Sequence, residues 1–377
     1  MKTPLIKNAL GALASRIREA TPTQRVDVAG TIRSALVSAG LDTAGGPASG
    51  VADTVRRALS GAGIDLHPGD ARASPDPVQA HRRTALPGTL SAHHFKGPAG
   101  ARDYKLYVPS TYDAAGSTPM PLVVMLHGCT QSPDDFAAGT RMNELAERHG
   151  VLVAYPAQAA NANGSKCWNW FRSEDQQRDQ GEPSLIVGIV RDIAAHHRVD
   201  ARRVYVAGLS AGAAMAVILG AAYPDVFAAV GAHSGLPYAA AHDMPSAFGA
   251  MNGQRTGARR PAPPAVPTIV FHGDQDHTVA ASNGVAIVDH AVRTAPRAGA
   301  VQSSTQSGTT ADGSRFQRSV HSDAAGTPLV EHWVLHGAGH AWSGGSAAGS
   351  YTSTRGPDAS AEMLRFFLLH ALPSTDG

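Results

Sequence analysis

From about residue 101 onward, short apolar runs alternate with stretches in which apolar residues recur every three or four positions. The short runs predict buried strands at 104–108, 122–126, 151–155, 204–207, 227–232, 269–271 and 331–335. The longer spacing predicts helices at 142–149, 185–197, 211–222, 281–294 and 358–370. Strands separated by helices indicate a doubly wound, mostly parallel sheet, in which chemistry gathers at the carboxyl ends of the strands.

The first hundred residues differ from the rest, because short helical patterns are followed there by a stretch with frequent glycine and proline. We predict a helical N-terminal extension over residues 1–66, a linker over 67–100 and the main α/β domain over 101–373. Residues 1–60 hold eight Lys and Arg against four Asp and Glu. Such a segment could contact a membrane surface, a lipid-coated granule or a polymer. The alternative is an extension that packs on its own domain or on a second subunit.

The overall composition excludes several classes of partner. Charged residues make up 16% of the 377 positions, and the formal net charge of +2 gives no reason to expect nucleic acid. No apolar run reaches the roughly 18 residues that a membrane span needs. The first twenty residues lack the long apolar core of a secretory signal, which favours the cytoplasm.

A serine stands where a predicted strand meets a predicted helix. The run Gly208-Leu209-Ser210-Ala211-Gly212 lies between VYVA and AAMAVILGA. Small residues two positions before and after the serine permit a sharp turn that lifts its hydroxyl above the sheet. The helix that follows directs its positive end at any oxyanion formed there. This context predicts Ser210 as a nucleophile.

A serine nucleophile needs a base and a carboxylate that orients the base. His340 lies in the glycine-rich stretch GAGHAW after the last predicted strand, and Asp276 follows the strand before it. The order Ser210, Asp276, His340 is that of α/β-hydrolases. We prefer Asp276 to Asp274, which we expect to shape the turn. We likewise prefer His340 to His336, which we expect to be structural.

The oxyanion of such a reaction needs preset hydrogen-bond donors. One predicted donor is the backbone N–H of Ala211, directly after the nucleophile. The other is the backbone N–H of Cys129, in the loop HGCTQ that follows the strand at 122–126. We expect His127, in the same loop, to be structural.

Six stretches of the chain together resemble a known family, the polyhydroxybutyrate (PHB) depolymerase-like esterases of the α/β-hydrolase superfamily, which are related to feruloyl and acetylxylan esterases. They are LHGCTQ (126–131), AYPAQ (154–158), CWNWF (167–171), VYVAGLSAGAAMA (204–216), FHGDQDHTV (271–279) and GAGHAWSGG (337–345). The resemblance covers about residues 101–370 and is very specific. It implies an α/β-hydrolase fold with Ser210, Asp276 and His340 as the triad. It also implies hydrolysis of short aliphatic polyesters or simple esters.

The two cysteines of the chain, Cys129 and Cys167, each lie in one of these stretches. A Cys129–Cys167 disulfide is therefore a hypothesis, and free buried thiols are the alternative. A bridge would close a loop of about 38 residues, contribute roughly 4 kcal/mol by the chain-entropy estimate and fix the oxyanion loop. It would also favour an extracellular location over the cytoplasm.

Three of the four tryptophans, Trp168, Trp170 and Trp342, lie near the predicted active-site loops. They are candidates for an apolar substrate platform, and core packing is the alternative for each. We expect Trp342 and one of the other two to touch substrate.

The expected function is a serine esterase that hydrolyses short-chain aliphatic polyesters or oligoesters, such as polyhydroxybutyrate, through an acyl-enzyme. The alternative enzyme is a feruloyl, acetylxylan or general carboxylesterase, since the triad does not separate these substrates. An alternative from a different class is a catalytically silent binding protein on the same scaffold. The Ser–Asp–His set argues against it, because such a protein has no physical need for an exposed, strained serine. We expect no metal, because the adjacent pairs His93-His94 and His196-His197 do not share a face and no Cys/His spacing resembles a zinc site. We expect no cofactor, because no phosphate-binding glycine loop or nucleotide fingerprint appears.

Overall fold

The computed structural model describes residues 86–254, 263–294 and 301–374. The chain divides at Thr84, and Ala85–Gly377 forms the second of its two units. The predicted helical extension over 1–66 and the linker up to residue 85 lie outside the described residues. All described residues belong to the second unit.

The described strands are β1 (Thr89–Gly97), β2 (Gly100–Val108), β3 (Met120–Leu126), β4 (Leu152–Pro156), β5 (Val199–Leu209), β6 (Ala229–His233), β7 (Thr268–Gly273), β8 (Gln302–Thr309), β9 (Arg315–Ser322) and β10 (Pro328–Leu335). The described helices are α4 (Pro133–Thr140), α5 (Met142–His149), α6 (Gly181–His196), α7 (Ala211–Ala222), α8 (Met244–Met251), α9 (Ser282–Thr294) and α10 (Ala359–Phe367), with one 3-10 turn, η3 (Glu174–Gln176). Every strand and helix predicted from residue 101 onward is confirmed, with shifted ends.

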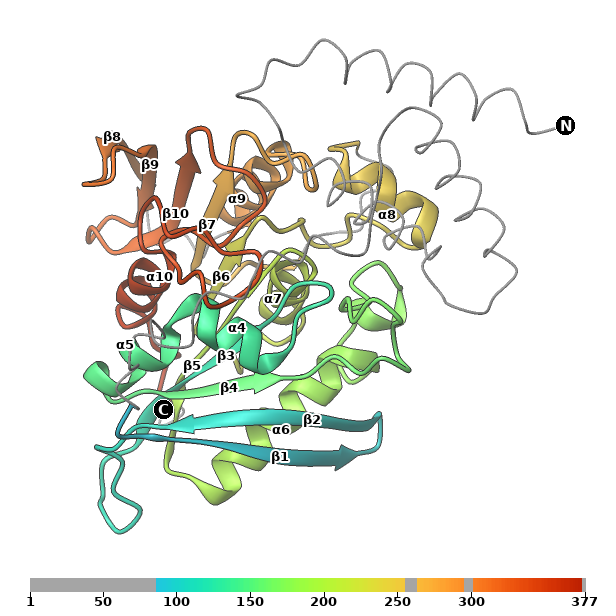
Figure 1. Ribbon diagram of the computed structural model, residues 1–377, viewed down its shortest axis with the longest axis vertical. Helices are drawn as coiled ribbons and strands as arrows, with labels where there is room; N and C mark the ends of the chain where they lie inside the picture. Colours follow the sequence, from blue (N-terminus) through green and yellow to red (C-terminus); the bar gives the residue numbers. More distant parts are fainter. Residues whose placement is uncertain (1–85, 255–262, 295–300, 375–377) are drawn as a thin grey trace, which may run out of the picture. The chain divides into compact units, whose positions relative to one another are not determined.

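The described strands form one sheet in the order β1-β2-β4-β3-β5-β6-β7-β10-β9-β8. The six central strands, from β4 to β10, run parallel, and an antiparallel hairpin flanks them at each edge. Figure 1 shows this sheet running from the β1–β2 hairpin to the β8–β9 hairpin. The prediction of a doubly wound, mostly parallel sheet is confirmed.

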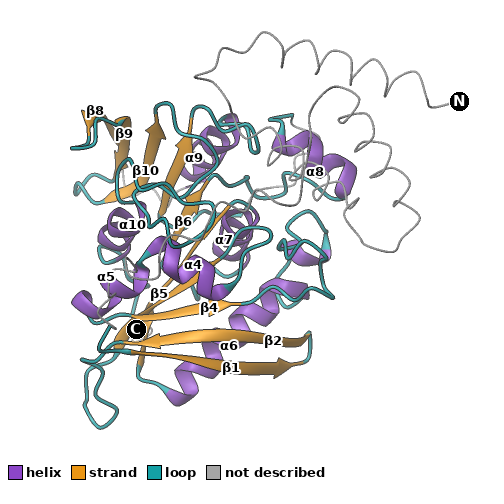
Figure 2. Ribbon diagram, viewed as in Figure 1, coloured by secondary structure: helices purple, strands orange, loops and turns teal. Residues whose placement is uncertain are grey.

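Alternate residues of each central strand enter two separate hydrophobic clusters, one on each face of the sheet. On β3, Leu122, Val124 and Leu126 pack in the cluster that contains residues of α6, α7 and α9. Val123 and Met125 pack in the cluster that contains residues of α4, α5 and α10. Helices therefore cover both faces (Figure 2), which explains why the central strands read as continuous apolar runs. No described helix has the length and apolar character to cross a membrane.

The predicted linker is wrong over residues 89–100, because these residues form β1 and its turn into β2. The hairpin pairs Thr89 with Val108 and Gly97 with Gly100. Gly100 has a φ of 124°, a conformation that glycine adopts readily. The glycines and proline of 97–100 therefore mark a hairpin turn, and the α/β domain begins before residue 101.

The second edge hairpin and two short helices were not predicted. Seven of the eight residues of β8 are exposed, so the strand has no apolar face for a periodicity argument to detect. Its backbone pairing with β9 alone defines it. Helix α4 begins after Ser132, whose hydroxyl accepts the Asp135 N–H at 3.2 Å, with Pro133 at the first helical position. Such a capping signal is visible in sequence, but Phe136 is the single large apolar residue of α4, so no apolar period marks this helix.

Candidate active site

Ser210 occupies a sharp turn between β5 and α7, as predicted. Its φ of 57° and ψ of −121° lie outside the regions that most residues with a side chain adopt. Such a conformation costs on the order of 1–3 kcal/mol and persists only where the surroundings enforce it. The Ser210 N–H donates to the His233 carbonyl at 2.9 Å. The residue is half-buried at the carboxyl end of β5.

The two glycines of this turn leave no room for a side chain. A Cβ at Gly208 would lie 2.4 Å from the Gly212 carbonyl carbon. A Cβ at Gly212 would lie 2.1 Å from the Leu126 carbonyl oxygen at the end of β3. Both positions therefore require glycine, which is the physical reason for the spacing that singled out Ser210.

Asp276 and His340, 64 residues apart, meet at the carboxyl ends of β7 and β10. His340 Nδ1 lies 2.7 Å from Asp276 Oδ2. Asp276 Oδ1 accepts the N–H groups of Thr278 and Val279, each at 2.9 Å. Burial raises the pKa of Asp276, but the hydrogen bond and charge of His340 and the Val279 N–H outweigh it and bring the pKa to about 2. The Asp276 carboxylate is therefore ionised at neutral pH.

This pairing assigns different roles to the two nitrogens of His340. Nδ1 donates to the Asp276 carboxylate, so Nε2 carries the lone pair that a general base needs. The His340 side chain is 12% exposed, so its ring is accessible at one edge. In the described part of the chain, no hydrogen bond joins the Ser210 hydroxyl to His340. Catalytic hydrogen bonds of free enzymes are often long and shorten when substrate binds.

Residues 127–131, named the oxyanion loop after the predicted donor Cys129, lie beside Ser210. A Cβ at Gly128 would be 3.7 Å from Ser210 Cβ. The Gly128 N–H donates to Gln131 Oε1 at 2.9 Å. The next N–H, that of Cys129, donates to no acceptor within residues 86–254, 263–294 and 301–374. Ala211 is the first residue of α7, so its N–H belongs to the first turn of the helix.

Cys129 and Cys167 form a disulfide, so the hypothesis drawn from the resemblance is confirmed. The bridge joins the oxyanion loop to the segment between β4 and α6. A backbone hydrogen bond from Thr130 N–H to the Ser165 carbonyl, at 2.7 Å, lies next to it. Two independent ties therefore hold the oxyanion loop against this segment.

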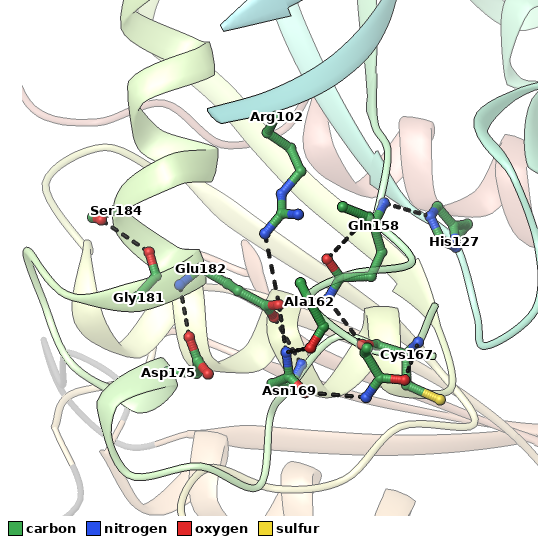
Figure 3. Close-up of polar contacts among 12 residues, drawn as sticks. Arg102, His127, Gln158, Ala162, Cys167, Asn169, Asp175, Gly181, Glu182 and Ser184 are labelled. Atoms are coloured by element: carbon green, nitrogen blue, oxygen red, sulfur yellow. Dashed lines mark hydrogen bonds and ion pairs between the residues drawn. The ribbon is translucent and has the colours of Figure 1, made fainter. Parts of the chain in front are cut away.

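A buried polar network supports the segment that carries Cys167 (Figure 3). Gln158 Nε2 donates to the Cys167 carbonyl at 2.9 Å, and the Gln158 N–H donates to His127 Nε2 at 3.0 Å. Glu182, in the first turn of α6, accepts the Asn169 N–H at 2.7 Å and Asn169 Nδ2 at 2.8 Å. It also accepts a hydrogen bond from Gln158 Nε2. The network therefore links α6 to the segment of Cys167 and, through Gln158, to His127 in the oxyanion loop.

The acids of this network are deeply buried. Arg102 Nη2 lies 3.8 Å from Glu182 Oε1, and Asp175 Oδ1 accepts the Glu182 N–H at 2.7 Å. Burial and the nearby charge of Asp175 raise the pKa of Glu182, and burial also raises the pKa of Asp175. Arg102 lowers both pKa values but does not offset burial, so both shifts run in the direction of the protonated acids.

The tryptophans lie in the core rather than on an accessible surface. Trp168 and Trp342 are fully buried, and Trp170 is 6% exposed. The Trp168 indole N–H donates to the His127 carbonyl at 3.1 Å, and that of Trp342 donates to Ser360 Oγ at 3.0 Å. The expected substrate contact of Trp342 is thus corrected to a packing role, because no face of its ring is open.

His233, which was not predicted, contacts both sides of the site. Its carbonyl accepts the Ser210 N–H, and its Nε2 accepts the Ser343 N–H at 3.1 Å, in the loop that carries His340. Its ring stacks between Phe271 and Trp342, with centroids at 5.8 and 5.3 Å. Complete burial lowers the pKa of His233 to about 3, so the ring stays neutral and keeps its acceptor.

Gln131 was also missed as a functional residue, although it stands in the stretch LHGCTQ. It is 2% exposed. Besides accepting the Gly128 N–H, it donates through Nε2 to Asp135 Oδ2 at 2.9 Å and to the Ser350 carbonyl at 2.8 Å. It therefore joins the oxyanion loop to α4 and to the loop that follows His340. The one indication in the sequence was that Gln131 ends LHGCTQ, a stretch that resembles the esterase family.

The remaining polar residues behave as supports. His127 Nδ1 donates to the Gly128 carbonyl at 2.7 Å, and burial lowers the pKa of His127 to about 4. Asp274 accepts the Gly337 N–H at 2.7 Å and lies 2.9 Å from His336 Nδ1. Asp274 thus ties its turn to the loop before His340. Among the described residues, no group of three or more His, Cys, Asp or Glu side chains is placed to hold a metal ion.

Comparison with known proteins extends the resemblance seen in the sequence. A family model described as Esterase PHB depolymerase matches residues 102–312, more than half of the chain. Poly(3-hydroxyalkanoate) depolymerase C of Paucimonas lemoignei is 37% identical over 240 residues, which are 58% of this chain and 54% of that protein. Feruloyl esterase B of Neurospora crassa is 36% identical over 143 residues, 38% of this chain and 46% of that protein. The chain spans about half the length of these relatives.

A solved structure supports the fold. The acetyl xylan esterase from Aspergillus awamori superposes with a TM-score of 0.54 over 74% of this chain and 99% of that chain, at 17% identity. The parallel sheet, the turn at Ser210 and this superposition together define an α/β-hydrolase fold. With a family model that matches over half its length, the chain belongs to the PHB depolymerase family of esterases.

Proposed function

We propose that this protein is a serine esterase that hydrolyses carboxylic esters through an acyl-enzyme, with Ser210, Asp276 and His340 as its triad. The observation that carries the proposal is the 2.7 Å contact between His340 Nδ1 and the ionised Asp276 carboxylate, at strand ends two and three positions from Ser210 in the sheet. Membership of an esterase family supports the same reaction class.

In the proposed first step, Ser210 Oγ forms a bond to the ester carbonyl carbon while His340 Nε2 takes the hydroxyl proton. The Asp276 carboxylate stabilises the imidazolium that forms. The N–H groups of Cys129 and Ala211 donate to the tetrahedral oxyanion, helped by the positive end of α7.

In the proposed second half, His340 gives its proton to the leaving alcohol as the carbon–oxygen bond breaks. Water then attacks the acyl-enzyme, with His340 again as base, and releases the acid and Ser210. Only water and the ester are consumed, so the scheme calls for no cofactor.

For the substrate, we propose a short-chain aliphatic polyester or oligoester such as polyhydroxybutyrate. Two relatives support it: the depolymerase of P. lemoignei and, at 28% identity, a poly(3-hydroxybutyrate) depolymerase of Ralstonia pickettii. Feruloyl or acetylxylan ester hydrolysis is the second candidate, favoured by the feruloyl esterase B of N. crassa and by the acetylxylan esterase A of Emericella nidulans at 33% identity.

Hydrolysis of a substrate panel by the purified protein tests both candidates. The panel holds p-nitrophenyl acyl esters, 3-hydroxybutyrate oligomers, amorphous polymer film and methyl ferulate. We expect turnover of the oligomers that falls at least about a thousandfold in Ser210→Ala. Activity on ferulate or short p-nitrophenyl esters alone favours the second candidate. Near-normal turnover by Ser210→Ala contradicts the triad.

Hydrolysis of the polymer film also tests a role for residues 1–60, which lie outside the described residues. We propose that this weakly basic segment contacts polymer, a granule surface or a second copy of the chain. Deleting residues 1–66 should then weaken film hydrolysis or change the molecular mass in solution, while soluble oligomers are still cleaved. Unchanged film hydrolysis and mass would contradict this role.

The Cys129–Cys167 bridge supports a further proposal, that the protein works in an oxidising compartment. Protein from fresh cells, alkylated without reduction, should then gain no alkyl groups. Addition of two alkyl groups would contradict that location.

A further inference from the structure

One aromatic residue at the active-site edge remains open to solvent. Tyr351, in the loop that follows His340, is 44% exposed. Its hydroxyl lies 3.4 Å from Thr130 Oγ1, and Thr130 is the residue after the proposed oxyanion donor Cys129. Tyr351 therefore brings the loop that follows His340 against the oxyanion loop. The tryptophans that the sequence offered for this place are buried.

The loop holds Tyr351 in a fixed position. The Tyr351 carbonyl accepts the Trp342 N–H at 2.8 Å. On one side, Ser350 donates its N–H and hydroxyl to Asp135 at 2.8 and 2.6 Å. On the other side, Thr352 Oγ1 donates to the Ser346 carbonyl at 2.6 Å. These ties to the core and to α4 hold the backbone of Tyr351, so its Cα is placed at this edge of the site before a ligand arrives.

Both residues of this contact have left-handed backbones. The φ of Tyr351 is 49° and that of Thr130 is 65°. L-residues adopt this region at a cost, and threonine is β-branched, so the surrounding hydrogen bonds enforce it. Core packing does not explain Tyr351, because its side chain is 44% exposed although its backbone is strained. A role in binding a ligand would explain both features.

The hydroxyl of Tyr351 is available to a ligand. Thr130 Oγ1 donates to the Cys129 carbonyl at 2.6 Å, which takes the single proton of the threonine. At 3.4 Å, the contact with Tyr351 is too long to satisfy the tyrosine hydroxyl. Tyr351 thus presents an apolar ring with a free polar tip, which suits a chain in which aliphatic units alternate with ester carbonyls.

We propose that Tyr351 and Thr130 form a binding site for the ester unit next to the scissile bond of an aliphatic oligoester. The ring packs on the aliphatic part of that unit, and the hydroxyl donates to its carbonyl. This inference rests on the proposed esterase function and adds a subsite to it. A monoester with a short acyl group does not reach the site, so Tyr351 favours oligomers over small esters.

The test compares Tyr351→Ala and Tyr351→Phe with the wild type on two substrates, a linear 3-hydroxybutyrate trimer and p-nitrophenyl acetate. We expect Tyr351→Ala to raise KM for the trimer about tenfold, or about 1.4 kcal/mol. For p-nitrophenyl acetate, kcat/KM should stay within about twofold. Tyr351→Phe, which lacks only the hydroxyl, should give an intermediate rise for the trimer. Tyrosine, phenylalanine and alanine all carry a Cβ, so the backbone strain is matched.

Leu369→Ala serves as a control. Leu369 is exposed to a similar extent, 50%, but it follows α10, where the nearby Leu372 N–H donates to the Arg202 carbonyl, seven residues before the end of β5. This variant should leave both substrates unchanged. Equal losses on trimer and p-nitrophenyl acetate would overturn the inference, because they would indicate a displaced loop. So would an unchanged trimer KM, or a wild type that cleaves p-nitrophenyl acetate but no trimer. A wild type inactive on every ester would contradict the proposed function itself.

Discussion

His233 is the residue on which several active-site contacts converge. It holds Ser210 through its carbonyl and the loop of His340 through Nε2, and its ring stacks against Trp342. We regard it as a positioning residue, because these contacts involve none of the proposed reacting atoms. A neutral ring is required, since a protonated Nε2 cannot accept the Ser343 N–H.

We predict that His233→Leu lowers kcat for p-nitrophenyl acetate at least about tenfold with little change in KM. The variant leaves the buried Ser343 N–H without an acceptor, so the His340 loop shifts while substrate contacts remain. His233→Gln keeps an acceptor oxygen and should retain kcat within about threefold. Steady-state kinetics of both variants, with melting curves to confirm folding, check this. Equal losses in the two would assign the effect to ring stacking and contradict the hydrogen-bond role.

At the scale of single residues, the sequence predicts a role for residues whose local context carries a signal. Ser210, Asp276 and His340 each follow a predicted strand, and the required glycines flank the first. The supports were not found, because their partners are distant in the chain: His233 bonds a residue 110 positions away, and Gln131 one 219 positions away. A buried polar side chain is recognisable only when its partners are known.

The loops at the strand ends are joined to one another as well as to the sheet. The disulfide ties the oxyanion loop to the segment before α6, Gln131 ties it to the loop after His340, and Asp274 ties the Asp276 turn to the loop before His340. Preorganised donors are effective because little rearrangement is left for the reaction itself. The strands and helices that carry these loops were predicted from sequence, but β1, β8 and β9 were not. β8 is exposed at seven of its eight positions, and β1 and β9 hold mainly polar residues that are at most partly buried, so none has an apolar period.

We predict that reducing Cys129–Cys167 lowers kcat for p-nitrophenyl acetate and the free energy of unfolding together. The chain-entropy estimate for a loop of 38 residues is about 4 kcal/mol of stability. The loss of kcat should be partial, because the Thr130–Ser165 backbone bond survives reduction. Activity and urea unfolding are measured with and without dithiothreitol, with mass after alkylation confirming reduction.

The control for this experiment is the double variant Cys129→Ala, Cys167→Ala. It should match the reduced wild type and be insensitive to dithiothreitol. A reduced wild type with unchanged kcat would show that the hydrogen bonds alone hold the oxyanion loop.

Across the whole molecule, buried titratable groups act on stability in opposite directions. Burial lowers the pKa of His127, His332 and His370 to about 4 and that of His233 to about 3. Each binds fewer protons folded than unfolded, so each adds stability as the pH rises toward about 6.5. The raised pKa values of Glu182 and Asp175 act in the opposite sense, because the folded acids hold protons that the unfolded acids release. The pH dependence of the wild-type free energy of unfolding therefore combines both effects. The contribution of one group is best measured as the difference between the wild type and a variant that lacks that group.

His370 offers that isolation, since it follows α10, packs on Phe366 and, among the described residues, forms no hydrogen bond with the proposed triad. Burial, opposed by a hydrogen bond with the Pro328 carbonyl, lowers the pKa of His370 to about 4. An asparagine can keep that donor but cannot titrate. Between pH about 6.5 and about 4, the wild type should therefore lose stability relative to His370→Asn by up to about 1.4 kcal/mol per pH unit, or about 3 kcal/mol in all. Urea unfolding of both proteins at several pH values measures the difference. A difference that stays constant with pH would mean that His370 has the same pKa in the folded and unfolded protein, and would contradict the shift. A pH-dependent difference with unchanged kcat would separate stability from catalysis in this fold.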